Sequence, residues 1–557
     1  MAQPFSGLQR KHIIDEMASG ELDVLVIGGG ITGAGILLDG AVRGMNAGLV
    51  EMQDFAAGTS SRSTKLVHGG LRYLKQFEVK LVAEVGKERA IVYENAPHVT
   101  NPEWMLLPIK KDGTFGKFTT SVGLAVYDRL AGVKKSERRS MLSKNETIAK
   151  EPLLNREGLK GGGYYVEYRT DDARLTLEVL KEGVARGGKA VNYVKAEELL
   201  YENGNVIGVR VQDLLSGEIK EIRAKKIINA AGPWVDEIRE MDHSKQGKHL
   251  FMTKGVHLVF DQKRFPLSQA VYFDTPFNDG RMMFAIPRDG KTYVGTTDTK
   301  YTKDPIHPLV TVEDRDYILK AVNGMFPDVN LTAEDMESSW AGVRPLIHEE
   351  GKGPSEISRK DEVFISNSGL ITIAGGKLTG YRKMAERVLD IAAAQLKAEG
   401  GGVFPGTETE NVILSGGYVG GSFGYGSYKK KMASEGMAHG FTEEEAEKLV
   451  SLYGSNITKI YEIVRTEGEE AQSHSLSREV FVSLKYGIEE EMVAAPIDFF
   501  NRRTGALFFD IEWVRRWKDP VIDYMQKRFS WTEDEKRMHA DTLDQHIRDA
   551  VEPLESK

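Results

Sequence analysis

The chain has 557 residues, of which 41% are hydrophobic and 28% are charged, so we expect a globular protein with two or three packed cores. Its 74 basic and 82 acidic residues give a net charge of −8, which argues against general nucleic-acid binding because binding to the phosphate backbone usually needs a basic surface. The chain contains no cysteine, which excludes disulfides, thiolate nucleophiles, iron–sulfur clusters and cysteinyl flavin links.

No run of the sequence approaches the roughly 20 apolar residues that a membrane-spanning helix needs. The N-terminal segment MAQPFSGLQRKHIIDEMASG lacks the apolar core of a signal peptide. We therefore expect a cytoplasmic protein, for which attachment to a membrane surface stays open. We predict no metal site.

Residues 23–51 have the pattern of a strand, a glycine-rich turn, a helix and a second strand. Gly28, Gly30 and Gly33 suit a dinucleotide-binding turn, which needs a tight bend, close backbone approach to a pyrophosphate and close packing of helix on strand. The N-terminus of the following helix would present free N–H groups to the phosphates. Glu51 ends the next strand, where a carboxylate binds ribose hydroxyls. The alternatives are a plain glycine-rich loop and an exposed glutamate.

FAD and NAD share this turn, so the choice between them depends on later segments. Residues 229–238 and 374–382 each place small residues at a strand end. A long flavin cofactor needs several such backbone approaches, which favours FAD, whereas the alternative is a pair of ordinary tight turns. Residues 52–76 are rich in Gly, Ser and Thr and predict a loop that lies against a ligand.

The remaining pattern predicts how the chain is organised. Residues 77–160 are mostly helical in pattern, and residues 175–232 return to α/β with a hairpin near 202–213. Residues 250–300 alternate apolar and polar side chains, which predicts antiparallel strands of a second, substrate-covering sheet. The glycine-rich stretch 399–426 is typical of a linker.

A helical C-terminal domain is predicted from about residue 405, where Thr442 and Glu445 form a capping-box pattern and Gly454 is a stop signal. We predict an α/β fold with a Rossmann-like FAD-binding domain, an antiparallel-sheet substrate domain and an all-helical C-terminal cap domain. The predicted FAD-binding domain takes residues 20–80, 160–250 and 360–404, the substrate domain takes 81–159 and 251–359, and the helical domain takes 405–557.

Several motifs occur together in chain order: GGGITGAGILLDGAVRG, TSSRSTKLVHGGLRYL, INAAGPWVD, GVHLVF, VGTTD, AGVRPL, ISRKD and AGGKLTGYRKMAE. In order and spacing they resemble the flavin-dependent sn-glycerol-3-phosphate dehydrogenases, over nearly the whole chain. The resemblance implies a fold similar to D-amino-acid oxidase and glutathione reductase. It also implies oxidation of sn-glycerol 3-phosphate to dihydroxyacetone phosphate by hydride transfer to noncovalently bound FAD.

A glycerol phosphate is a small dianion, and arginine suits it because a planar guanidinium donates two parallel hydrogen bonds to a phosphate. The resemblance assigns Arg72, Tyr73 and Arg359 to the phosphate. It assigns Arg344 and Lys377 to polarising the oxygen that is oxidised. It also places Thr296 in hydrogen-bonding reach of the substrate, where a turn-forming threonine is the alternative. For each arginine the alternative is a solvated surface charge.

Oxidation at carbon 2 requires a base that takes the hydroxyl proton. His257 matches a substrate-site histidine of the family, and histidine titrates near neutral pH. A structural histidine in a half-buried strand is the alternative. The resemblance implies further cofactor contacts, with Val194 beside the adenine and no covalent link to His68: Ser60, Ser61, Lys65, Leu66, His68, Val194, Ala230, Gly232, Gly376, Lys377, Leu378 and Thr379.

In the resembled family, electrons leave the flavin for a membrane quinone in dehydrogenases and for dioxygen in oxidases. The oxidases carry an extra internal segment that this chain has no room for, which favours quinone and peripheral attachment to the inner face of the membrane. Competing hypotheses are an alpha-glycerophosphate oxidase, an FAD amine or amino-acid oxidase, and a noncatalytic flavin-binding protein. The sequence does not fix the oligomeric state, and a homodimer is one state that we consider.

Two segments are candidates for the membrane contact, and for both the alternative is a core-facing helix with a solvated edge. Each combines apolar residues at helical spacing with neighbouring basic residues. In 119–139 these are Val122, Val126, Leu130, Val133, Lys134, Lys135, Arg138 and Arg139. In 505–519 they are Leu507, Ile511, Trp513, Val514, Arg515, Arg516 and Trp517.

Overall fold

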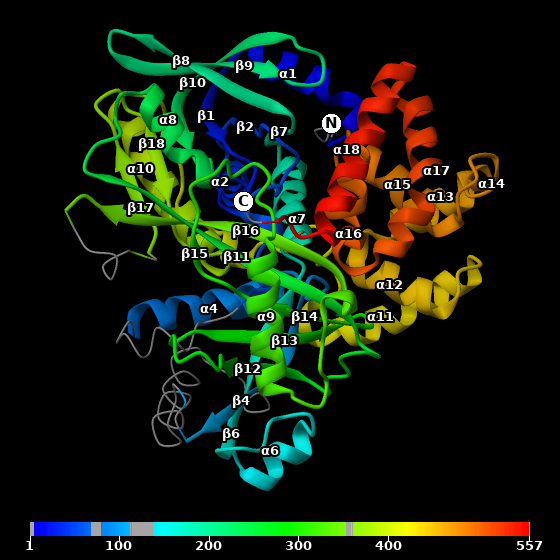
Figure 1. The fold of residues 1–557 in the computed structure, drawn as a ribbon. Coiled ribbons are helices and arrows are strands. Elements are labelled where there is room, and N and C mark those ends of the chain that lie inside the picture. The colour runs from blue at the N-terminus through cyan, green and yellow to red at the C-terminus, as the bar shows by residue number, and fades with distance from the viewer. Residues whose placement is uncertain are drawn as a thin grey trace.

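A computed structural model describes residues 5–67, 79–111, 113, 138–351, 358 and 360–555. Within these residues the chain forms two sheets and a helical C-terminal region (Figure 1). The predicted α/β class and the predicted helical C-terminal part are confirmed.

The first sheet is built on β1 (Glu21–Ile27), where Val24, Leu25 and Val26 are fully buried. Such a continuous apolar run is typical of a parallel strand that is covered on both faces. β1 pairs in parallel with β2 and β10. In path order the strands are β17 (Glu362–Ile365), β18 (Ile371–Ala374), β10 (Ile219–Asn229), β1 (Glu21–Ile27), β2 (Ala47–Val50) and β7 (Lys189–Val191), with β8 (Val194–Glu202) and β9 (Asn205–Asp213) as a hairpin beside β10.

Helices complete this α/β part. Helix α2 (Ile31–Val42) follows the glycine turn, and it contacts both α7 (Asp172–Ala185) and α10 (Tyr381–Ala398). The predicted hairpin near 202–213 is confirmed, with Asn203 and Gly204 at positive φ as a two-residue turn requires. The helices of this part are α1 (Arg10–Ala18), α2 (Ile31–Val42), α7 (Asp172–Ala185), α8 (Val235–Met241) and α10 (Tyr381–Ala398).

The second sheet is antiparallel except where β12 pairs in parallel with β4. This confirms the antiparallel strands predicted for 250–300. Helix α9 (Val312–Met325) packs on β11 and β14. In path order the strands are β15 (Thr299–Lys300), β11 (Lys248–Asp261), β14 (Lys291–Gly295), β13 (Met282–Arg288), β12 (Ala270–Asp274), β4 (Thr100–Lys110), β6 (Leu159–Thr170) and β3 (Leu66–Val67), with β16 (Met336–Glu349) beside β11 and β5 (Ser140–Ser143) beside β6.

One prediction about residues 77–160 was wrong for the residues that the structure describes. Helices α4 (Val79–Asn95) and α6 (Lys144–Lys150) do form, but β4 and β5 lie between them, so the described residues 79–111, 113 and 138–160 are not mostly helical. Residues 105–107 and 109 are all buried, and such a run lacks the alternation that marks a half-buried strand. Strand β6 crosses the predicted boundary at residue 160, and it pairs along its length with β4 in the second sheet. The domain boundaries stay predictions.

The C-terminal region is helical, as expected. Thr442 and Glu445 form the predicted capping box, and Gly454 ends α12 with φ 54°. Part of the predicted linker 399–426 is helical instead, because α11 already begins at Gly421. The elements are α11 (Gly421–Ala438), α12 (Glu443–Tyr453), α13 (Ile457–Glu467), α14 (Glu470–Ser473), α15 (Arg478–Glu490), the π-helix η10 (Asp498–Arg503), α16 (Ala506–Phe509), α17 (Ile511–Phe529) and α18 (Glu533–Val551).

The second candidate membrane segment, 505–519, does not present an apolar face. Leu507, Ile511 and Val514 are buried in the core of the helical region, so the core-facing alternative is correct for them. Most of the first segment, 119–139, lies outside the described residues. None of the described helices is long and apolar enough to cross a membrane.

A buried charge cluster joins α7 of the first part to the helical region. Lys181 lies 3.2 Å from Glu178 Oε2 and 3.0 Å from Glu491 Oε1, and Arg174 contacts both carboxylates. Burial raises the pKa of Glu178, but Lys181, His98 and Arg174 outweigh burial and hold it at about 2. Glu178 is therefore ionised across the working pH range.

We expect Glu178→Gln to lower the free energy of unfolding by about 3 kcal/mol at pH 7, because it leaves two buried cations with one fewer counter-charge. Since the folded pKa lies below the unfolded value near 4.3, this stabilisation is present above about pH 5 and is lost as the pH falls toward 2. Urea unfolding of both proteins at several pH values measures the difference. A constant difference down to pH 3, or an equal loss in Glu435→Gln at the surface, would contradict this account.

Candidate active site

A cavity of about 570 Å³ lies between the carboxyl ends of the first sheet and the second sheet. Ile27, Val50, Ala230 and Gly375 line it from the ends of β1, β2, β10 and β18. Ligands of open α/β sheets bind at this edge, and the volume suits an organic cofactor or substrate.

The glycine turn approaches β10 so closely that side chains are excluded. Gly28 has φ +115°, and a Cβ there would lie 2.5 Å from the Ala230 carbonyl oxygen. A Cβ on Gly33 would lie 1.8 Å from the Gly28 carbonyl oxygen. Gly28 and Gly30 line the cavity, whereas Gly33 packs α2 against the turn without lining it. This cradle fits a dinucleotide pyrophosphate at the N-terminus of α2.

The Glu51 side chain is held beside this turn. Its Oε2 accepts a hydrogen bond of 2.6 Å from the Gly29 N–H, and its Oε1 accepts one of 2.7 Å from the Gln53 N–H. Burial raises the pKa of this carboxyl, and the two N–H donors oppose the rise. Glu51 and Val194 both line the cavity, and the Val194 N–H donates to the Glu51 carbonyl at 2.7 Å. The predicted ribose and adenine contacts therefore lie side by side.

The loop after Glu51 lies against the cavity, as predicted. Ser60 and Leu66 line it, and the Ser60 hydroxyl accepts from the Ile31 N–H at 3.0 Å. Ser61 and Lys65 do not line it, although they were predicted to contact the cofactor. The Lys65 ammonium instead donates to Asp172 Oδ1 at 2.6 Å and to the Ser61 carbonyl at 3.0 Å. These two residues shape the loop.

The later glycine-bearing strand ends also reach the cavity. Gly375 and Gly376 have φ of 74° and 83°, so the chain turns sharply after β18. This turn brings four predicted residues to one wall. The predicted residues that line the cavity from these two strand ends are Ala230, Gly232, Gly376, Lys377, Leu378 and Thr379.

His257 on β11 faces the cavity and is only 1% exposed. Its ring stacks on Trp340 with a centroid distance of 4.7 Å, and Nε2 lies 3.0 Å from the Thr64 hydroxyl. Burial lowers the pKa of His257 well below 6.5, and the positive charges of Arg344 and Lys65 lower it further. The imidazole is therefore neutral at neutral pH and can accept a proton.

Arg344 on β16 lies near His257. Its Nη2 donates to the Thr296 hydroxyl at 2.9 Å, and its Nη1 donates to the Thr297 carbonyl at 3.2 Å. A Cβ on Gly255 would lie 2.3 Å from Arg344 Nη2. His257, Thr296 and Arg344 thus line the same cavity close to one another. A proton acceptor beside a cation suits the oxidation of an alcohol, because the cation stabilises negative charge on the oxygen that loses its proton.

Four predicted residues, His68, Arg72, Tyr73 and Arg359, lie outside the described residues and stay predictions. The sequence reasoning missed Arg62 and Arg281, which both line the cavity. Neither arginine has a distinctive spacing. It also missed the strand glycine Gly295, where a Cβ would lie 2.2 Å from the His257 ring. An isolated glycine in a strand was an available signal, since it indicates close approach of another group.

Two family models match the chain. Residues 23–382 match the family described as FAD dependent oxidoreductase, and residues 407–536 match the C-terminal domain of alpha-glycerophosphate oxidase. The chain is 62% identical over 555 residues to the aerobic glycerol-3-phosphate dehydrogenase of Bacillus subtilis (strain 168), covering 100% of both chains. It is 56% identical over 547 residues to that of Staphylococcus haemolyticus (strain JCSC1435), covering 98% of each.

Solved structures are similar as well. The X-ray structure of the glycerol-3-phosphate dehydrogenase from Bacillus halodurans complexed with FAD is 53% identical, has a TM-score of 0.86, and is matched over 99% of this chain and 100% of that chain. The L-alpha-glycerophosphate oxidase from Mycoplasma pneumoniae with FAD bound is 17% identical, with a TM-score of 0.55 over 67% of this chain and 95% of that chain. The second likeness concerns the fold alone.

We expect Gly33→Ala to abolish flavin binding, because the added Cβ would meet backbone that cannot move without opening the turn. The flavin absorbance of the purified protein, relative to protein absorbance, measures the loss. Gly20→Ala is the matched control, since a Cβ there meets nothing within 4 Å. Equal flavin content in the two variants would refute the assigned role of the turn.

Proposed function

Because the chain belongs to the FAD-dependent oxidoreductase family and is 62% identical to an aerobic glycerol-3-phosphate dehydrogenase, we propose that it oxidises sn-glycerol 3-phosphate to dihydroxyacetone phosphate. The single observation that carries the proposal is the cavity end where neutral His257 lies beside the Arg344 guanidinium. A buried base next to a cation suits the oxidation of an alcohol, because the base takes the hydroxyl proton and the cation stabilises the negative charge left on the oxygen.

We assign the cofactor contacts from the cavity wall. The turn at Gly28 and Gly30, with the N-terminus of α2, would hold the FAD pyrophosphate, and Glu51 would bind the adenosine ribose with Val194 beside the adenine. The turn at 376–379 would lie near the flavin ring. When bound, FAD supplies the acceptor for the substrate hydride.

The residues of the chain supply the proton chemistry. His257 would take the hydroxyl proton of carbon 2 at its imidazole, which the surrounding protein keeps neutral. Arg344, fixed by Thr296 and the Thr297 carbonyl, would stabilise negative charge that develops on the same oxygen. Lys377 lines the same cavity and would assist Arg344. Arg72, Tyr73 and Arg359 complete the proposed phosphate site.

We extend the proposal to the electron acceptor, a membrane quinone, and to a role in glycerol catabolism at the inner face of the membrane. The support is full-length identity of 62% to a dehydrogenase, against 17% to an alpha-glycerophosphate oxidase over part of the chain. The apolar and basic segment 119–139 stays the candidate membrane contact.

Anaerobic mixing of the yellow holoprotein with glycerol 3-phosphate should bleach the oxidised flavin band, and a soluble quinone should restore it faster than dioxygen does. Stopped-flow absorbance measures both steps. No bleaching would remove the substrate assignment, and bleaching by amino acids alone would favour the amino-acid oxidase alternative. Faster restoration by air than by quinone would assign the protein to the oxidases.

We expect His257→Asn to slow flavin reduction about 10²- to 10⁴-fold while FAD stays bound, because the general base is lost. Since the pKa of His257 is lowered well below 6.5, the imidazole is fully deprotonated at neutral pH. The rate of flavin reduction by the wild-type protein should therefore fall only at pH values below 6.5. The matched control is His249→Asn on the same strand, which should leave the rate unchanged. A rate of flavin reduction that already falls at or above pH 6.5 would contradict the assignment of His257 as the base.

A further inference from the structure

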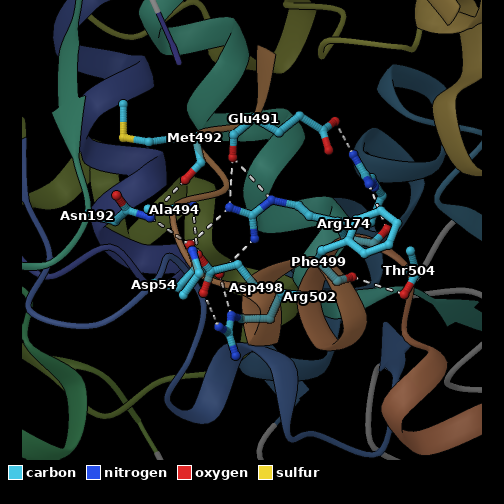
Figure 2. Close-up of polar contacts among 12 residues, drawn as sticks. Asp54, Arg174, Asn192, Glu491, Met492, Ala494, Asp498, Phe499, Arg502 and Thr504 are labelled. Carbon is cyan, nitrogen blue, oxygen red and sulfur yellow. Dashed lines mark hydrogen bonds and ion pairs between the residues drawn. The ribbon is translucent and has the colours of Figure 1, made fainter. Parts of the chain in front are cut away.

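A π-helix of the C-terminal helical region, η10, binds a carboxylate that lies close in sequence to Glu51. Asp54 is fully buried, and its carboxylate accepts hydrogen bonds from Arg503 Nη1 at 2.7 Å, Arg503 Nη2 at 2.9 Å and Asn192 Nδ2 at 2.9 Å, and also from Arg502 Nε (Figure 2). Burial raises the pKa of Asp54, but Arg503 and Arg502 hold it at about 2. The Asp54 carboxylate is therefore ionised and both of its oxygens accept hydrogen bonds. We call this contact between η10 and Asp54 the Asp54 junction.

A second junction of the same π-helix uses Tyr193. The Tyr193 hydroxyl donates to Asp498 Oδ1 at 2.6 Å, and Arg502 Nη2 donates to the same oxygen at 2.8 Å. The other oxygen of Asp498 accepts from the Ala494 and Ala495 N–H groups at 3.0 and 2.8 Å (Figure 2). Arg502 therefore links the Asp54 junction to the Tyr193 junction.

Both junctions are tied through the backbone to the cavity wall. The Tyr193 N–H donates to the Gln53 carbonyl at 2.9 Å, and the Val194 N–H donates to the Glu51 carbonyl at 2.7 Å. The Gln53 N–H in turn holds the Glu51 side chain at 2.7 Å. Asp54 and Tyr193 thus fix the two segments that carry Glu51 and Val194. Neither Asp54 nor any η10 residue lines the cavity itself.

We propose that η10 positions the adenosine end of FAD from outside the cavity, with Asp54, Tyr193, Arg502 and Arg503 as positioning residues; this rests on the FAD site proposed above. Buried ion pairs add little net stability over apolar packing, but in some proteins they select one arrangement of the chain, and this is the role that we propose for the η10 pairs. A preformed Glu51–Val194 wall spares FAD binding the cost of ordering it. By linkage, bound FAD must stabilise η10 to the same extent.

The sharpest test is Tyr193→Phe, which removes one hydroxyl and changes no charge. Titration of the full-length apoprotein with FAD should give a dissociation constant about tenfold higher than for the wild type, the typical effect of a hydrogen bond to a charged group. At saturating FAD the rate constant of flavin reduction should stay within about twofold. The matched control is Tyr461→Phe, which loses a buried 2.7 Å bond to the Met432 carbonyl in the same helical region.

If η10 is only structural, both tyrosine variants will melt at lower temperature and neither will bind FAD more weakly, and this result would overturn the proposal. The Glu51→Gln variant distinguishes failure of the proposed FAD site from failure of the positioning role. An unchanged dissociation constant in Glu51→Gln would overturn the FAD site and the positioning role together. Weaker binding in Glu51→Gln, with unchanged binding in both Tyr193→Phe and Asp54→Asn, would overturn the positioning role alone.

Hydrogen exchange gives an independent readout of the reciprocal effect. Removal of FAD from the wild-type protein should speed amide exchange in residues 498–503, and Tyr193→Phe should reduce this response. Exchange in α13, which lies in the same helical region, should not respond to FAD. An FAD-independent exchange rate in 498–503 would refute the coupling.

Discussion

The close approach of backbones at the glycine turn is the constraint on which the rest of the site depends. Gly28 and Gly33 bring the end of β1, the start of α2 and the end of β10 within van der Waals distance, so no side chain stands between them. The carboxyl ends of the parallel strands can then form one continuous wall, along which Glu51, Ala230 and Gly376 all reach the same cavity. A bulkier turn would separate these strand ends.

The second sheet provides the electrostatic half of the site. Its strand glycines, Gly255 and Gly295, leave room for the Arg344 guanidinium and the His257 ring on neighbouring strands. The proximity of Arg344 and the burial of His257 then act in the same direction, because both disfavour the imidazolium form. The same two glycines therefore leave room for both side chains whose proximity lowers the pKa of His257. The helical region contacts the first part through buried ion pairs, in which Arg503 pairs with Asp54 and Glu491 pairs with Lys181.

Local sequence patterns predicted the turns, hairpins and helix caps that neighbouring residues determine. They did not predict structure that depends on strand pairing or on burial by distant residues. The β1–α2 turn, the hairpin at 203–204 and the Thr442 capping box depend on neighbouring residues, so the sequence predicted them correctly. Strand β4 was mistaken for helix because a short apolar run does not by itself distinguish a buried strand from a helix. Its strand conformation depends on pairing with β6. Similarly, helical spacing could not tell whether Leu507 faces a membrane or a core, and the structure buries it.

By itself, the sequence indicated the dinucleotide-binding turn and identified the family, because motif spacing carries this information, and the family resemblance singled out His257, Thr296 and Arg344 as candidate site residues. Only the tertiary structure decided that these three residues line one cavity, that Lys65 pairs with Asp172, and that η10 reaches Asp54. The physical reason is that these contacts join residues far apart in the chain. Their geometry, burial and pKa follow from packing, which no local pattern encodes.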